Sequence, residues 1–284
     1  MKTLYFDCVS GASGDMVIGA LIDAGADPAY LKEELKKLGI ESEYDLAWKK
    51  VNKNGITSTK FDVLLSEKES SHHHHEDGHS HHHSHDHGHL HDHEDHHQDH
   101  TQDHEHHHDH NHAHHHRTYM SIKKMISDST LEEKVKSLSI AIFKKIAEAE
   151  GKIHGMPIEE VHFHEVGAVD SIIDIVGTAI LMESLRIDKV AASPVPLGAG
   201  KISIDHGIYP VPAPATLEIL KGVPLEKSDV RAELVTPTGA AIIAVLAEEF
   251  GGLPSFTVES IGYGAGTRMF PSHPNVIRVV IGNS

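Results

Sequence analysis

The chain has 284 residues, a formal net charge of −17 with its histidines neutral, and one cysteine, Cys8. An acidic protein is poorly suited to nucleic acid or an anionic membrane surface, and it favours cations as partners. One cysteine excludes an internal disulfide, and Cys8 is expected to be a small buried residue at a strand end. Because no signal-peptide core and no apolar run of about 20 residues is present, we expect a cytoplasmic protein with no nucleic-acid or membrane partner.

Hydrophobic periodicity predicts helices and strands in alternation along most of the chain. The predicted strands lie at 2–6, 44–48, 61–65, 256–262 and 275–281, with short strands within 189–209. The predicted helices lie at 16–23, 28–38, 119–126, 131–150, 170–185, 212–221 and 240–250. Segments 205–207 and 262–266 read as loops. The pattern predicts an α/β or α+β fold with a mixed sheet and flanking helices, and it leaves the strand order open.

A run of histidines interrupts this pattern. Residues 72–116 contain 25 of the 30 histidines, interleaved with carboxylates. The run has almost no apolar residues, so it is expected to be a disordered insertion. We therefore divide the chain into an N-terminal α/β segment at 1–66, a metal-binding insertion at 67–117, and the remainder of the same folded unit at 118–284.

Neutral imidazole is a common ligand for nickel, zinc, cobalt and copper, so the insertion is expected to bind such metals. The candidate ligands stand in consecutive groups: His72, His73, His74, His75, His81, His82, His83, His106, His107, His108, His114, His115 and His116. A purification tag or a polar linker is an alternative interpretation, but a tag would be terminal and nearly pure histidine. Composition does not say whether the metal is stored, delivered or used.

A second group of candidate ligands lies outside the insertion. His162 and His164 would share one face of an extended segment, and Glu165 follows them. Asp170 and Asp174 are four residues apart, so they would share a helix face. These donors are predicted to form a metal site, although exposed histidines and a simple helix cap remain the structural alternative. A further ligand could come from Asp7, Asp15 or His206.

A small-residue turn joins the first predicted strand to the first helix. Its sequence is SGASGD at 10–15, and it would expose backbone N–H groups near a helix start. Such groups can hold a phosphate, so Ser10, Gly11, Ser13 and Gly14 are candidate ligand-binding residues. The turn lacks the Gly-Lys-Ser/Thr of a P-loop, and a turn that merely needs small residues is equally compatible.

Three motifs together resemble one protein family. They are YFDCVSGASGDM at 5–16, HFHEVGAVDSIIDIVG at 162–177 and TPTG at 236–239. They resemble the nickel-insertion protein of the lactate-racemase maturation system, in which a His-rich insertion also lies between the first two motifs. The resemblance extends over essentially the whole chain.

The resemblance implies a reaction that composition and spacing could not have suggested. The family inserts nickel into pyridinium-3,5-bisthiocarboxylic acid mononucleotide, giving a nickel-pincer cofactor with a carbon–nickel bond. The reaction is a CTP-dependent cyclometallation, assigned to the lyases, and it implies a divalent cation with the CTP. The lactate racemase apoenzyme is then an expected partner. Glu165 is the candidate base for the ring proton.

Family members often continue into a C-terminal portion that carries the nucleotide site. We therefore expect this chain to act with such a portion as a partner, and a homo-oligomer is compatible with the sequence. Two other functions stay open: a nickel or zinc store or chaperone, and a metal-dependent hydrolase. Deletion of 72–116 would distinguish them, because a store would lose its whole function.

Overall fold

The computed structural model describes residues 1–66, 117–163, 166, 168–204 and 207–283. The described residues before position 67 and after position 116 form one compact unit. The candidate ligands of the His-rich insertion lie outside the described residues, as do His164, Glu165 and His206.

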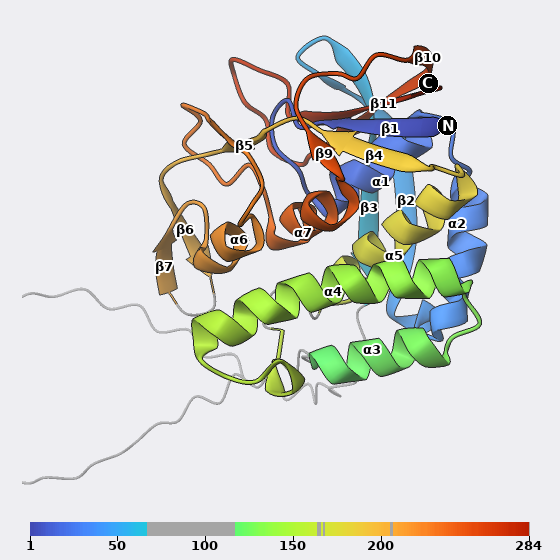
Figure 1. Ribbon diagram of the computed structural model, residues 1–284, viewed down its shortest axis with the longest axis vertical. Coiled ribbons are helices and arrows are strands. Elements are labelled where there is room, and N and C mark those ends of the chain that lie inside the picture. Colours follow the sequence, from blue (N-terminus) through green and yellow to red (C-terminus); the bar gives the residue numbers. More distant parts are fainter. Residues whose placement is uncertain (67–116, 164–165, 167, 205–206, 284) are drawn as a thin grey trace, which may run out of the picture. The chain divides into compact units, whose positions relative to one another are not determined.

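A seven-stranded mixed sheet and several helices make up this unit (Figure 1). The strands are β1 (Lys2–Asp7), β2 (Tyr44–Lys53), β3 (Ile56–Leu65), β4 (Lys189–Ala192), β5 (Val195–Leu197), β6 (Lys201–Ile204), β7 (Gly207–Pro210), β8 (Leu225–Lys227), β9 (Glu249–Phe250), β10 (Thr257–Ala265) and β11 (Val276–Asn283). The α-helices are α1 (Gly14–Asp23), α2 (Pro28–Leu35), α3 (Tyr119–Asp128), α4 (Glu133–His154), α5 (Val169–Ser184), α6 (Pro214–Ile219) and α7 (Pro237–Leu246). The predicted fold class is confirmed.

The strand order, which the sequence left open, is β2-β3-β10-β11-β1-β4-β9. β1 pairs antiparallel with β11 and parallel with β4, and β10 pairs parallel with β3. The strands before the insertion therefore lie beside strands from the far end of the chain. Two small sheets, β5–β8 and β6–β7, stand apart from the main sheet.

The helices cover one face of the sheet (Figure 1). α1 packs on β3, β10 and β11, and α5 packs between α1 and α4. Twelve of the 16 residues of α5 are buried, because this helix is covered by sheet-side and outer helices at once. α3 packs on the outer side of α4. On the opposite face of the sheet, Tyr5, Ala191 and Val280 form a small apolar cluster with Phe256.

Two predicted elements are wrong in part. The segment at 262–266 was expected to be a loop, but Gly262–Ala265 belongs to β10. A Cβ on Gly264 would lie 1.7 Å from the carbonyl oxygen of Met16, so glycine lets the strand approach α1 closely. The helix predicted at 240–250 instead runs as α7 from Pro237 to Leu246. Its predicted last residues form β9, which pairs with β4.

The short strand β8 was not predicted. Its residues are exposed and lack the apolar alternation on which strand prediction depends.

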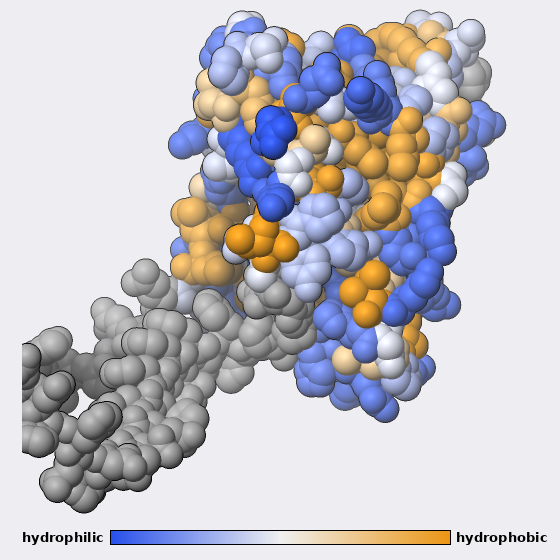
Figure 2. All heavy atoms as spheres, turned by 90° about the vertical axis from the view of Figure 1, so that its left-hand side faces the viewer, coloured by the Kyte–Doolittle hydropathy of each residue, from blue (hydrophilic) through white to orange (hydrophobic). Residues whose placement is uncertain are grey.

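The surface carries apolar side chains between charged ones, as Figure 2 shows for one face. Exposed apolar residues include Ile208 on β7, Leu217 on α6 and Leu225 on β8. No helix in the described ranges combines the length and apolar character needed to cross a bilayer.

Candidate functional site

A cavity of about 470 Å³ lies where α1, α5 and α7 begin. Ser13, Gly14 and Asp15 line it from the start of α1. The first turns of α5 contribute Asp170, Ser171 and Asp174, and α7 contributes Thr236, Pro237 and Thr238. The three motifs that carry the family resemblance thus meet at one cavity. The first and third motifs are more than 200 residues apart in the sequence, so spacing alone could not predict that they meet.

The first motif is tied to the third by backbone hydrogen bonds. The Ala12 N–H donates to the Leu234 carbonyl at 3.0 Å, and the Thr236 N–H donates to the Ala12 carbonyl at 3.1 Å. Gly11 has a φ of +115°, and a Cβ there would lie 1.9 Å from the Leu234 carbonyl oxygen. Glycine is therefore needed at this turn for packing as well as for conformation.

The same turn uses some of its donors internally. The Gly11 N–H donates to the Cys8 carbonyl at 3.1 Å, and Ser10 is buried with its Oγ bonded to the Pro274 carbonyl. Of the four residues expected to hold a phosphate, only Ser13 and Gly14 are among the described residues that line the cavity. That this turn binds a phosphate stays a prediction. It now concerns only Ser13 and Gly14, at the start of α1.

Asp174 is the acid of the cavity whose side chain is buried. Its Oδ1 is buried and has no hydrogen-bond partner in the described part of the chain, while the backbone N–H of Asp15 contacts its carboxylate. Burial first, and then the charges of Asp15 and Asp170, raise the pKa of Asp174 well above its ordinary value of 3.8. A Cβ on Gly14 would lie 2.5 Å from Asp174 Oδ2, so only glycine leaves room for this carboxylate.

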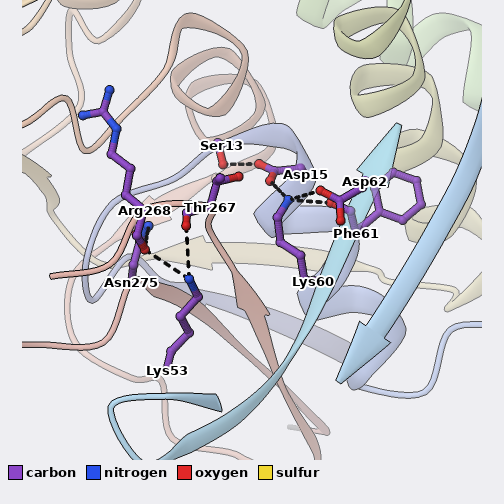
Figure 3. Close-up of polar contacts among 9 residues, drawn as sticks. All are labelled: Ser13, Asp15, Lys53, Lys60, Phe61, Asp62, Thr267, Arg268 and Asn275. Atoms are coloured by element: carbon purple, nitrogen blue, oxygen red, sulfur yellow. Dashed lines mark hydrogen bonds and ion pairs between the residues drawn. The ribbon is translucent and has the colours of Figure 1, made fainter. Parts of the chain in front are cut away.

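Lys60 lines the cavity from β3 and belongs to a network of ion pairs (Figure 3). Its Nζ lies 2.6 Å from Asp15 Oδ2 and 2.8 Å from Asp62 Oδ1, and it donates to the Phe61 carbonyl at 2.7 Å. Ser13 Oγ donates to Asp15 Oδ1. Burial alone would lower the pKa of the Lys60 ammonium, but the carboxylates of Asp15 and Asp62 outweigh it and raise that pKa.

The electrostatics of the cavity suit a cation held among oxygens. Asp15, Asp62, Asp170, Asp174 and Glu233 all line it. Partial positive charge at the starts of three helices favours ionised carboxylates there. Carboxylate oxygens bind divalent cations, although within the described ranges no three His, Cys, Asp or Glu side chains already converge as a ligand set.

The structure brings some of the predicted metal ligands together and places others elsewhere. Asp15, Asp170 and Asp174 are brought together at the cavity. Asp7 lies elsewhere and forms an ion pair with Arg278 of β11. His162 is exposed, pairs with Thr118 in an isolated bridge, and is not among the described residues lining the cavity.

Sequence reasoning missed Lys60 and Asp62. Both alternate with apolar residues on β3 and so read as the solvent face of a half-buried strand. Only the packing of α1 against β3 brings them to the cavity. Cys8, by contrast, is buried as expected, and burial raises the pKa of its thiol to about 12.

The comparisons with known proteins cover almost the whole chain. The family model described as nickel insertion protein matches residues 4–284. The chain belongs to the nickel insertion protein family. The predicted resemblance is confirmed, and no solved structure matches the chain.

Three relatives carry the name pyridinium-3,5-bisthiocarboxylic acid mononucleotide nickel insertion protein. The relative from Geobacillus kaustophilus is 49% identical over 99% of this chain and 60% of its own length. Those from Clostridium kluyveri and Clostridium acetobutylicum are 48% and 50% identical, again over 99% of this chain, and over 62% and 64% of their own lengths. The chain therefore spans about three fifths of the length of the relatives it matches.

Proposed function

We propose that this chain takes part in inserting nickel into pyridinium-3,5-bisthiocarboxylic acid mononucleotide and that the cavity at the starts of α1, α5 and α7 is where Ni²⁺ is received. The observation that carries this is the buried Oδ1 of Asp174, which has no partner among the described residues and lies beside Asp15 in an acidic cavity. A buried polar atom without a partner is costly, and a bound cation would supply the missing interaction. The names of the relatives supply the substrate.

Ni²⁺ and the mononucleotide are both substrates in this proposal. Asp15 and Asp174 would bind the metal through oxygens, with Asp170 at the cavity edge. The N–H groups at the helix starts would face the anionic groups of the mononucleotide. Each carbon–nickel bond replaces a carbon–hydrogen bond, so a base must accept one proton. Glu165 remains the proposed base and lies outside the described residues.

We propose that the His-rich insertion recruits Ni²⁺ loosely and that the cavity receives it. Imidazoles in surplus bind nickel reversibly, which suits delivery. We propose three partners: CTP with its divalent cation, the C-terminal portion of the relatives, and the lactate racemase apoenzyme. The sequence of this chain contains no Gly-Lys-Ser/Thr loop for the nucleotide.

The test is reconstitution with purified components. The chain is mixed with the mononucleotide, Ni²⁺, CTP and Mg²⁺, with and without the further portion taken from a relative, and cofactor formation is followed by mass and absorbance. Asp15→Asn and Asp174→Asn should each lower product formation at least about 100-fold if both carboxylates hold the metal. Asp128→Asn is the matched control, because Asp128 pairs with Lys124 on the surface of α3.

The density of histidine in the insertion favours nickel storage as a second candidate function. If both cavity variants make cofactor at the wild-type rate, the cavity is not the insertion site. If no mixture makes cofactor and all bound nickel is lost with residues 72–116, storage is the better description.

A further inference from the structure

Lys60 occupies the position that a cation would take beside Asp15. Its ammonium contacts three oxygens, those of Asp15 and Asp62 and the Phe61 carbonyl, at 2.6 to 2.8 Å. Its side chain is only 11% exposed, so this charge is held inside the cavity wall (Figure 3). Lys60 supplies one positive charge, whereas the two carboxylates that it contacts could balance the two charges of a divalent cation.

Asp174 has a side-chain oxygen that this arrangement leaves unsatisfied. Its buried Oδ1 has no hydrogen-bond partner among the residues the structure describes. Asp15 lies between the two groups, since its backbone N–H contacts Asp174 and its carboxylate contacts Lys60. A divalent cation that used both carboxylates would compete with Lys60 for the Asp15 oxygen.

We propose that Lys60 is a built-in counter-ion that an incoming divalent cation displaces from Asp15. This inference rests on the proposed function of the cavity. After displacement, the Lys60 ammonium would stay paired with the carboxylate of Asp62. Asp62 already contacts Lys60 and is more exposed than Asp15. The movement is therefore a short shift from a shared position to Asp62 alone.

The consequence is a lower affinity for every cation by a common factor. Ions that carboxylates bind weakly would then leave the cavity empty at their ordinary concentrations, whereas a strongly bound transition-metal ion would still fill it. Lys60 would thus prevent occupation of the cavity by weakly bound cations. A purely structural role, joining β3 to α1, predicts no gain in metal affinity when Lys60 is neutralised.

The experiment measures Mn²⁺ binding to the full-length chain by the EPR signal of free Mn²⁺. Mn²⁺ is the probe because carboxylate oxygens suit it, while the imidazoles of the insertion favour other metals. Lys60→Gln and Lys60→Met are expected to tighten cavity binding at least about tenfold. Lys60→Arg keeps the charge and should not tighten it. Lys50→Gln is the matched control, because it removes a lysine–aspartate pair on the neighbouring strand.

The outcomes separate this inference from the proposed function. If Asp15→Asn abolishes cavity binding but neutral residues at 60 leave it unchanged or weaker, the counter-ion role is wrong and the metal site survives. If neither Asp15→Asn nor Asp174→Asn alters Mn²⁺ binding, the proposed site itself fails.

If the Lys60 variants do not unfold cooperatively, Asp62→Asn provides a second test of the displacement. Loss of the alternative acceptor should hold Lys60 on Asp15 and weaken Mn²⁺ binding several-fold. Unchanged or tighter binding in Asp62→Asn would overturn the displacement.

Discussion

Asp174→Asn should stabilise the metal-free protein. Asparagine has nearly the same shape and can still accept the Asp15 N–H, but it removes a buried charge whose Oδ1 has no partner in the described structure. The asparagine amide also lacks a partner among the described residues at this position, so only the extra cost of the charge is removed, and the free energy of unfolding should rise by about 1–3 kcal/mol. For a folded unit of this size, the melting temperature should then rise by roughly 2–12 °C.

The pH dependence fixes the sign of the effect. The pKa of Asp174 is raised in the folded state, so wild-type stability is lost as pH rises from 3.8 through the folded pKa. The advantage of Asp174→Asn should therefore grow as pH rises from 3.8 through the folded pKa and should shrink toward acid, where the wild-type carboxyl is protonated. Asp15 and Asp170 contribute to this shift after burial.

The assay is thermal unfolding by circular dichroism at several pH values, with a chelator present. Asp128→Asn is the control, because Asp128 is exposed on α3 and does not line the cavity, so it should give no stabilisation. Adding Ni²⁺ should reverse the order and protect the wild type more than Asp174→Asn. A destabilised Asp174→Asn protein at neutral pH would refute the reasoning that this carboxylate is held at a cost for function.

Three further outcomes are expected. Gly14→Ala should weaken cation binding and cost about 1–3 kcal/mol of stability, because its Cβ would lie 2.4 Å from a neighbouring carbon; Gly252→Ala, with open space around it, should change neither in parallel melts and titrations. Deleting 72–116 should lower the number of nickel ions bound in calorimetry while a cooperative melt remains, and equal stoichiometry would contradict the recruiting role. In the deleted chain, His162→Ala with His164→Ala should leave the remaining tight nickel binding in place in calorimetry, because His162 is not among the described residues lining the cavity, and loss of that binding would make these histidines ligands.

The sequence by itself determined the elements with a strong local signal. The alternation in β2 and β3 and the helical periodicity of α4 depend on neighbouring residues, so they could be predicted from a single sequence. The three motifs likewise identified the family, because each is a long local pattern. The acids at 170 and 174 were found for the same reason, since helical spacing places them on one face.

Only the tertiary structure decided which of these residues act together. The strand order brings β10 and β11 between β3 and β1, and this pairing has no local signal in the sequence. Lys60 was expected at the surface, but the packing of α1 against β3 pairs it with Asp15. Asp7 forms an ion pair with Arg278 instead of lining the cavity. Burial of Asp174 and its raised pKa arise from the same packing. Charges and contacts of this kind depend on residues far apart in the chain, so periodicity and composition cannot supply them.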